Sequence, residues 1–236
     1  MPKAPAHCSA MTHVGLVRSG NEDAIAVSAT NDFPLICWNG ALPIEHGWAL
    51  VADGIGGHVA GEVASQIVVE LLRPVLGSLT NRDEITLALN AANDGLFDTI
   101  KRHPEFEGMG TTIAGAILRR DHALAWNVGD SRVYLHHQGK LTQVSTDDVV
   151  GGNMLTQCLG GFSRLTRIVP HVREIQVPPG ATALLCTDGL TNMVSEACIA
   201  SILSTSSDSS AAALVAAALT AGGQDNVSAV VISVPA

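Results

Sequence analysis

Short apolar runs bounded by turn residues recur along the chain and predict β-strands. Each run has the length of a strand and contains β-branched residues. The predicted strands are residues 23–29, 47–52, 112–119, 122–128, 132–137, 172–177, 182–187 and 227–234, with tight turns at 119–122 and 138–140. Because several strands follow one another directly, the order favours antiparallel pairing over a repeated strand–helix–strand unit.

Two longer segments carry apolar residues on one side only, at spacings of three and four, which predicts amphipathic helices over 63–75 and 85–100. Asn81, followed by Glu84, is typical of a helix N-cap with an acid in the first turn. Two further helices are predicted at 196–203 and 211–219. The pattern as a whole predicts a sheet-rich core covered by helices.

The length and composition of the chain predict the number of domains, and its net charge limits the class of partner. The chain has 236 residues, 47% of them hydrophobic, which is enough to bury a substantial core in one domain spanning residues 1–236. Its net charge of -9 argues against nucleic acid as a partner, because phosphate backbones require a basic face.

The cysteines and the apolar segments indicate in which cellular compartment we expect the protein. The five cysteines contain no CxxC pair, so neither a disulfide framework nor a zinc knuckle is predicted. The N-terminus lacks the apolar core of a signal peptide, and the apolar stretch 211–219 is much shorter than the ~20 residues that span a bilayer. We therefore expect a cytoplasmic protein without a membrane anchor.

Four aspartates stand at the ends of predicted strands, each beside a glycine or an asparagine: Asp53, Asp130 and Asp188 follow a strand, and Asp225 immediately precedes the last one. A single aspartate in this position is usually turn chemistry. Strand ends can direct several side chains into one cleft, and Mg²⁺ and Mn²⁺ prefer carboxylate oxygens with water completing the shell. The spacing alone leaves turn residues and a metal site as comparable interpretations.

Other nucleotide and hydrolase motifs are not supported. The glycine-rich segment after Asp53 lies between a strand and a helix, but Val59 occupies the third position of a GxGxxG pattern, and the acid would repel a pyrophosphate. The sequence has no Walker A, HExxH or GxSxG motif.

Six segments in order along the chain resemble those of the metal-dependent protein phosphatases of the type 2C family, in the bacterial style. The segments are residues 15–23, 51–65, 110–112, 129–132, 187–190 and 225–226. The resemblance implies an α+β fold of two stacked antiparallel β-sheets flanked by antiparallel helix pairs, a four-layer α-β-β-α sandwich. It also implies two Mn²⁺ or Mg²⁺ ions per active site, with a third as an option.

The same resemblance implies roles for individual residues. Asp53 would bridge the two metals, and the Gly54 carbonyl would complete the second site. Asp188 and Asp225 would hold the first metal, and Glu22 would reach the second through water.

Three more roles follow from the resemblance. Asp23 would orient the attacking water, and Asp130 would join Asp188 at a third, weaker metal site. Arg18 would bind the substrate phosphate, for which a bidentate guanidinium is well suited. The alternative for Arg18 is an ordinary surface ion pair, for example with Glu22.

The chain departs from the family pattern in two places. Where bacterial members carry Asp-His-Ser, this chain has residues 146–148 with no histidine, and the flap segment that follows is severely shortened. We expect a more open cleft and weaker binding of the third metal. Ile55 stands where eukaryotic relatives have a histidine, and His58 is expected to be a loop or capping residue, so metal-bound water is the expected proton donor.

The resemblance implies hydrolysis of phosphoserine or phosphothreonine in proteins by a water or hydroxide that bridges the two metals. The implied partners are phosphorylated proteins, substrates of a cognate serine/threonine kinase, and the protein is expected to be a monomer. Two alternatives stay open at this point: a hydrolase for small phosphomonoesters, and a non-catalytic regulatory module on the same fold.

Overall fold

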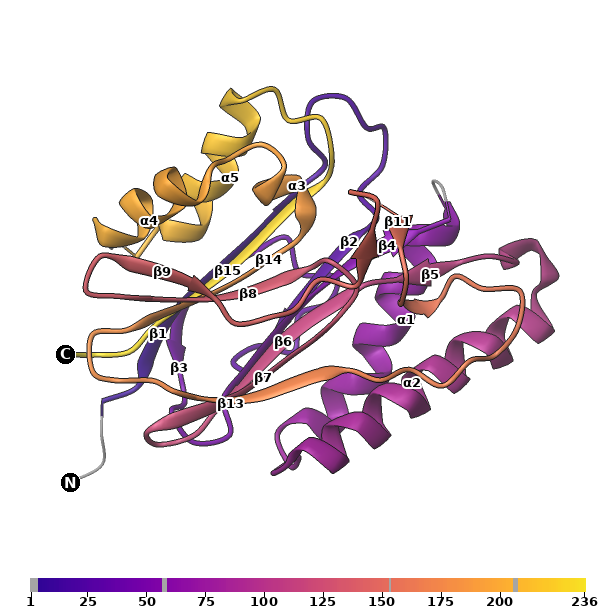
Figure 1. Ribbon diagram of the computed structural model, residues 1–236, viewed down its shortest axis with the longest axis horizontal. Helices are drawn as coiled ribbons and strands as arrows, with labels where there is room; N and C mark the ends of the chain where they lie inside the picture. The colour runs from indigo at the N-terminus through magenta and orange to yellow at the C-terminus, as the bar shows by residue number, and fades with distance from the viewer. Residues whose placement is uncertain (1–3, 57–58, 153, 206–207) are drawn as a thin grey trace.

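The computed structural model describes residues 4–56, 59–152, 154–205 and 208–236, and it is a sandwich of two antiparallel sheets between two layers of helices (Figure 1). Helices α1 (Val59–Leu76) and α2 (Arg82–Arg102) cover one sheet. Helices α4 (Glu196–Ser204) and α5 (Ser210–Thr220) cover the other. The predicted fold class is confirmed.

The sheet beneath α4 and α5 has the order β3-β1-β15-β14-β8-β9, with antiparallel pairing throughout. The strands are β1 (Ala6–His13), β3 (Cys37–Leu42), β8 (Arg132–His137), β9 (Lys140–Gln143), β14 (Thr182–Cys186) and β15 (Val227–Ser233).

The sheet beneath α1 and α2 has the order β12-β5-β4-β6-β7-β13, and β2 also pairs with β4. Its strands are β2 (Asp23–Val27), β4 (Trp48–Ile55), β5 (Gly110–Thr111), β6 (Ile113–Leu118), β7 (His122–Val128), β12 (Leu159–Gly160) and β13 (His171–Gln176). A small hairpin of β10 (Val149–Val150) and β11 (Met154–Leu155) lies apart from both sheets, and the short elements η1 (Pro104–Phe106) and α3 (Asp188–Thr191) complete the chain.

Three apolar layers hold the sandwich together. One lies between α1, α2 and their sheet and contains Trp126 and Leu50. The second, between the two sheets, contains Ile25 and Leu185. The third lies under α4 and α5 and contains Leu214. Each sheet therefore packs against helices on one face and against the other sheet on the opposite face, and this packing fixes the positions of the strand ends.

All eight predicted strands are present, with ends shifted by at most three residues. The predicted helices and both predicted turns are also present, and Asn81 Oδ1 accepts a hydrogen bond from Glu84 N at 3.0 Å, as expected of a cap. All five cysteines are free. No helix in the ranges that the structure describes is long and apolar enough to cross a bilayer.

Seven strands of the described chain were not predicted: the two-residue strands β5, β10, β11 and β12, the four-residue β9, and the two longest of the seven, β1 and β3. Strand β1 buries small side chains such as Ala6, Cys8 and Ala10, and also Ser9, so it lacks the β-branched alternation that marks a strand in sequence. Strand β3 is an edge strand with mostly exposed or half-exposed residues. Their strand conformation follows from pairing with β15 and with each other, which is a tertiary effect.

Candidate active site

The site lies where β2, β4 and α3 meet (Figure 1), and its first feature is that Asp23 and Asp53 stand opposite each other in the β2–β4 register. The expectation that Asp53 ends its strand is wrong. Strand β4 continues to Ile55, because Gly54 and Ile55 pair with Thr111 and its neighbour on β5. Asp53 therefore sits within a sheet, not on a turn.

The backbone around Asp53 is fixed by hydrogen bonds. The Asp53 carbonyl accepts from Thr112 N at 2.9 Å and from Thr111 Oγ1 at 2.8 Å, and Gly54 N donates to the Glu22 carbonyl at 3.1 Å. A Cβ at Gly54 would collide with the carbonyls of Gly61 and Glu22. Only glycine fits there, so this backbone lies closer to α1 than any other residue would allow.

Asp23 is buried beneath this site. Its Oδ2 accepts hydrogen bonds from Ser228 Oγ at 2.6 Å and from Thr187 Oγ1 at 2.9 Å. Its Oδ1 is buried with no hydrogen-bond partner among the described residues. Burial raises the pKa of Asp23 to about 7, against the two hydroxyl hydrogen bonds that lower it. A buried acceptor oxygen beside Asp53 therefore has no hydrogen-bond donor among the described residues.

Asp188 begins the short helix α3, which places its carboxyl beside that of Asp53. Asn192 Nδ2 donates a hydrogen bond to Asp188 Oδ2 at 3.0 Å. Burial, followed by repulsion from Asp23 and Asp188, raises the pKa of Asp53 well above its ordinary value. Burial also raises the pKa of Asp188. The fold therefore brings together carboxyl groups whose ionised forms repel one another.

Arg18 and Asp225 form an ion pair at the mouth of the site. The Arg18 Nη2 atom lies 2.7 Å from Asp225 Oδ2, and the side chains are 51% and 38% exposed. The hydrogen bond to Asp225 is the main cause of a raised pKa for Arg18. An ion pair was the alternative for Arg18, but the structure places it on Asp225, not on Glu22.

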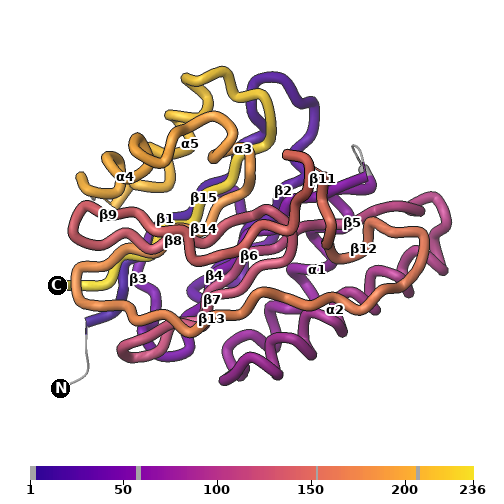
Figure 2. Tube along the Cα trace, in the orientation of Figure 1, coloured from indigo at the N-terminus to yellow at the C-terminus, as the bar shows by residue number. Residues whose placement is uncertain are grey.

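Asn226 ties the Arg18 segment to the start of β15. Its Nδ2 donates to the carbonyls of Val14 and Gly20, both at 2.9 Å, and its Oδ1 accepts from Glu22 N at 2.8 Å. Figure 2 shows the indigo segment between β1 and β2 beside the yellow segment that precedes β15. The sequence indicated Asn226 only as part of a motif, and its positioning role depends on residues more than 200 positions away.

Glu22 and Asp130 lie at the borders of the site. A Cβ on Gly61 would collide with the Glu22 carboxylate, so that carboxylate packs against the start of α1. Burial, and then the charge of Asp188, raises the pKa of Asp130 to about 6. The turn before Asp130 is held by Asp148, whose Oδ2 accepts from Gly129 N at 2.9 Å.

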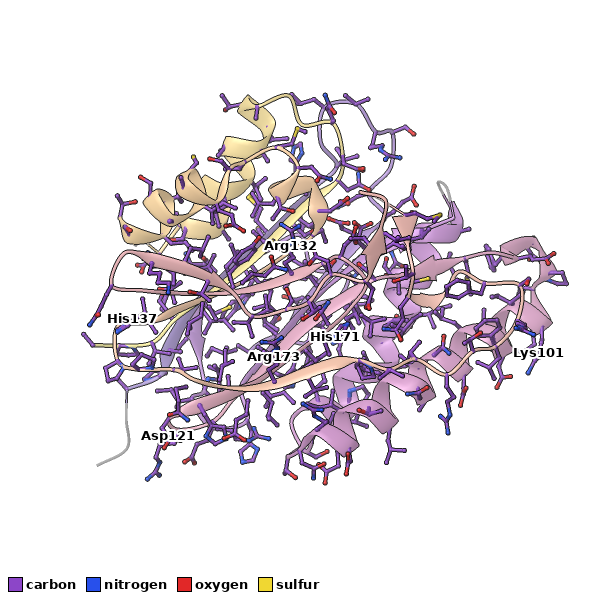
Figure 3. The ribbon with its side chains drawn as sticks, viewed as in Figure 1. Lys101, Asp121, Arg132, His137, His171 and Arg173 are labelled. Atoms are coloured by element: carbon purple, nitrogen blue, oxygen red, sulfur yellow. The ribbon has the colours of Figure 1, made fainter. Side chains whose placement is uncertain are left out.

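Asp147 and Asp148, in the segment where the resemblance leads one to expect Asp-His-Ser, each bind a side chain, and Figure 3 labels both partners. Asp147 Oδ2 accepts from Arg132 Nη2 at 2.7 Å. Asp148 Oδ1 lies 2.9 Å from His171 Nε2. His171 lies 23 positions from Asp148, so its contact was not foreseen. Of the motif residues, Gly57, His58 and Asn153 lie outside the described residues.

The donors present suit hard divalent cations, which prefer carboxylate oxygens and water. The unpartnered Oδ1 of Asp23 and the mutual repulsion of the neighbouring carboxylates fit this chemistry. In the described ranges, no three Asp, Glu, His or Cys side chains already enclose an ion position. Asp225 points to Arg18, and it would have to turn towards Asp188 to join a shared site.

Comparison with known proteins decides the family. Residues 40–221 match the family described as Protein phosphatase 2C. The chain belongs to this family. It is 31% identical to the serine/threonine protein phosphatase PstP of Mycobacterium tuberculosis over 93% of its length, and it spans 43% of that protein. It is also 31% identical to the serine/threonine phosphatase stp of Listeria innocua, covering 96% of this chain and 95% of that one.

The solved structures agree with this assignment. The catalytic domain of PstP in complex with two manganese ions superposes with a TM-score of 0.81 at 30% identity, covering 98% of this chain and 99% of that one. These relatives are named serine/threonine phosphatases, which agrees with the expected enzyme class. The expected cofactor, two Mn²⁺ or Mg²⁺ ions, is confirmed at the level of the family.

Proposed function

We propose that the protein hydrolyses phosphoserine and phosphothreonine in other proteins, with two divalent ions held around Asp53. The observation that carries this proposal is the convergence of side chains from four remote segments of the chain. Asp23 and Asp53 face each other across β2 and β4, Asp188 lies beside Asp53, and the Arg18–Asp225 pair stands at the mouth. The family of the chain supports the same reaction.

Each residue keeps the role that the resemblance implies. Asp53 would bridge the two ions with the Gly54 carbonyl on the second, Asp188 and Asp225 would hold the first, and Glu22 would reach the second through water. Two adjacent cations supply an activated water and neutralise the phosphoryl oxygens. The placement of Gly54 and Glu22 against each other supports a shared second site.

The protein's own side chains would orient the substrate and the nucleophile. Arg18 would turn from Asp225 to the phosphate and bind it through two N–H groups. The buried Oδ1 of Asp23, which lacks a protein donor in the described part of the chain, would accept a proton or a hydrogen bond from the attacking water. Thr187 and Ser228 would keep that carboxyl in place from its other oxygen.

A third, weaker metal site at Asp130 and Asp188 is part of this proposal. The proximity of the Asp188 charge to Asp130 supports it. Residues 146–148 have no histidine of the kind that the resemblance leads one to expect there. They are held by the hydrogen bond from Gly129 N to Asp148 and by the Arg132–Asp147 pair, and we therefore expect the third ion to bind weakly.

We further propose that residues 1–236 act as one domain and as a monomer in the cytoplasm, on the phosphorylated products of a serine/threonine kinase. The pairing of β1 near the start of the chain with β15 near its end supports a single unit. Five free cysteines support a reducing compartment.

The test is hydrolysis of a phosphothreonine peptide with and without Mn²⁺. We expect Mn²⁺-dependent turnover that is abolished by chelation and by Asp53→Ala. Activity that survives EDTA would contradict the proposal. A higher kcat/KM for a small phosphate ester than for every phosphopeptide would favour a small-molecule hydrolase instead, and calorimetry that shows no Mn²⁺ or Mg²⁺ binding would favour a non-catalytic module.

A further inference from the structure

Residues 149–173 differ from the rest of the chain in charge and in exposure. This stretch contains three arginines and no Asp or Glu, although the whole chain has 22 acids against 13 Lys and Arg. Of the eleven large hydrophobic side chains that are exposed in the described part of the chain, five lie in it: Val150, Met154, Phe162, Leu165 and Val169. Exposed apolar side chains beside cations are typical of a surface that binds another polypeptide.

A surface pocket of about 310 Å³ lies between this stretch and α2. Figures 1 and 2 show the orange segment after β12 running along α2. Phe97 of α2 and Phe162 of the segment both line the pocket, and they are two of the four phenylalanines of the chain. The pocket therefore offers aromatic surface to an incoming side chain.

The wall of this pocket is held in place from α2. Buried Asn93 accepts a hydrogen bond from Gly160 N at 2.8 Å and donates to the Thr166 carbonyl at 2.9 Å. The neighbouring Asn90 holds Ile168 in the same way, through both its N–H and its carbonyl. A wall fixed at three backbone positions is already ordered before a ligand binds, which lowers the entropic cost of binding.

The rim of the pocket carries positive charge that the fold does not use. Arg167 lines the pocket, and Arg164 lies three residues before it; both are exposed. Within the described residues, neither guanidinium has an ion-pair partner. An acidic ligand is the charge complement of this rim.

The pocket is connected to the active site through the sheet. Gly160 at its edge pairs with Gly110 on β5, and Thr111 pairs with Gly54 on β4. Two strand spacings separate the pocket edge from Gly54, which is about 10 Å. An extended peptide covers that distance with about three residues.

We propose that Phe97, Phe162, Arg164, Leu165 and Arg167 form a docking face for the phosphoprotein substrate. This docking face binds an acidic segment that contains one aromatic or large aliphatic side chain, about three residues or more from the phosphorylated residue. The apolar side chain enters the pocket, and the flanking carboxylates pair with Arg164 and Arg167. The inference rests on the proposed phosphatase function and names the class of substrate that the enzyme prefers.

The experiment uses three phosphothreonine peptides of equal length and one small ester, para-nitrophenyl phosphate. One peptide carries Glu-Glu-Phe-Glu on the N-terminal side of the phosphothreonine, one carries it on the C-terminal side, and one has Ala and Gln there. We expect wild-type kcat/KM to be about tenfold higher for one acidic peptide than for the neutral one, through KM, from partial burial of the phenylalanine and two screened ion pairs. Added salt should reduce this preference.

The double variant Arg164→Glu/Arg167→Glu should lose the preference and leave turnover of the ester within twofold. The matched control is Lys140→Glu/Arg120→Glu, which introduces the same charge change elsewhere. Lys140 pairs with His137 in the β8–β9 register, and Figure 3 shows His137 at the opposite end of the molecule from Lys101 of α2. Phe162→Ala should reduce the preference without changing the charge.

Two outcomes would overturn the docking face: wild-type rates that differ by less than twofold among the peptides, or an equal loss on peptides and ester in the double variant. If the wild-type enzyme hydrolyses no phosphopeptide, the proposed function fails separately. Fluorescence anisotropy with the labelled acidic peptides then decides the docking face. Weaker binding by Arg164→Glu/Arg167→Glu than by the control supports it, and equal binding contradicts it.

Discussion

The Arg18 guanidinium donates from Nη2 to Asp225 Oδ2 at 2.7 Å, joining two residues that are 207 positions apart in the sequence. One of the two is assigned here to the substrate phosphate and the other to a metal. The pair therefore links metal binding to substrate binding. When Asp225 binds a metal ion, the Arg18 guanidinium becomes available to the phosphate. Because both side chains are partly exposed, exchange of partners requires little loss of buried structure.

Replacing Arg18 should weaken substrate binding far more than it changes stability. We expect Arg18→Ala to lower kcat/KM for a phosphopeptide by about 100-fold, since charge-assisted hydrogen bonds to phosphate contribute about 1.5–3 kcal/mol each. The kcat/KM of Arg18→Lys should lie between those of the wild type and Arg18→Ala, because lysine supplies a point charge without the bidentate geometry. The free energy of unfolding should change by less than about 1 kcal/mol. The matched control is Arg120→Ala, which removes the exposed Arg120–Glu45 pair; an equal loss of activity there would contradict the assignment.

Asp53→Asn should have opposite effects in the absence and presence of metal. In chelator the variant should melt at a higher temperature than the wild type, because burial and neighbouring charges make the ionised Asp53 carboxylate costly at neutral pH. With Mn²⁺ the wild type should gain stability and the variant should gain much less. Differential scanning fluorimetry measures both, with exposed Asp32→Asn as the control. A wild-type-like Mn²⁺ shift in Asp53→Asn would remove this residue from the metal site.

The contribution of Asp23 to the stability of the metal-free protein should fall as the pH rises from about 4 to about 7 and stay constant above that. The pKa of Asp23 in the folded protein is about 7, above the value of about 3.9 in an unfolded chain. A carboxyl of this kind contributes its full stability below the unfolded pKa and loses it as the pH rises through the folded pKa. Asp23→Asn stays neutral, so it should flatten the dependence, measured by melting in EDTA across this range. An unchanged slope in Asp23→Asn would show that Asp23 is not the titrating group.

Asn226→Ala should release the segment that carries Arg18. The substitution removes two donated hydrogen bonds and one accepted one, and it leaves the Val14 and Gly20 carbonyls to find other partners. At about 1 kcal/mol each, the loss of stability should be about 2–3 kcal/mol. We expect KM for a phosphopeptide to rise more than kcat falls, because the guanidinium is no longer held in position. A steady-state assay separates the two; a change confined to kcat with an unchanged KM would argue against a positioning role.

Asp130→Ala tests the third metal site. We expect the variant to need roughly tenfold more Mn²⁺ for half-maximal activity on a phosphopeptide, with the two tighter ions still bound. The titration is run from micromolar to millimolar Mn²⁺, with Asp121→Ala as the remote control. Full activity of Asp130→Ala at every Mn²⁺ concentration would exclude a role for this site.

Most of the regular structure could be predicted from the sequence, because it depends on local periodicity. The strands that are buried on both faces, such as β6, β14 and β15, are predicted to within one residue of their ends. The Asn81 cap was also predictable, since donor and acceptor lie three residues apart. Strands β1 and β3 were not, because small or exposed side chains carry little periodic signal and their pairing is supplied by distant strands.

The candidate site divides in the same way. The sequence alone determined its chemical inventory: the aspartates, Arg18, and the glycines beside them, in an order that indicated the family. Only the tertiary structure decided which of these groups touch. It paired Arg18 with Asp225 and not with Glu22, left one Asp23 oxygen without a donor in the described chain, and brought His171 to Asp148. The sequence states which side chains are present. Whether two of them touch across 20 to 200 positions depends on how the two packed sheets bring the ends of their strands together.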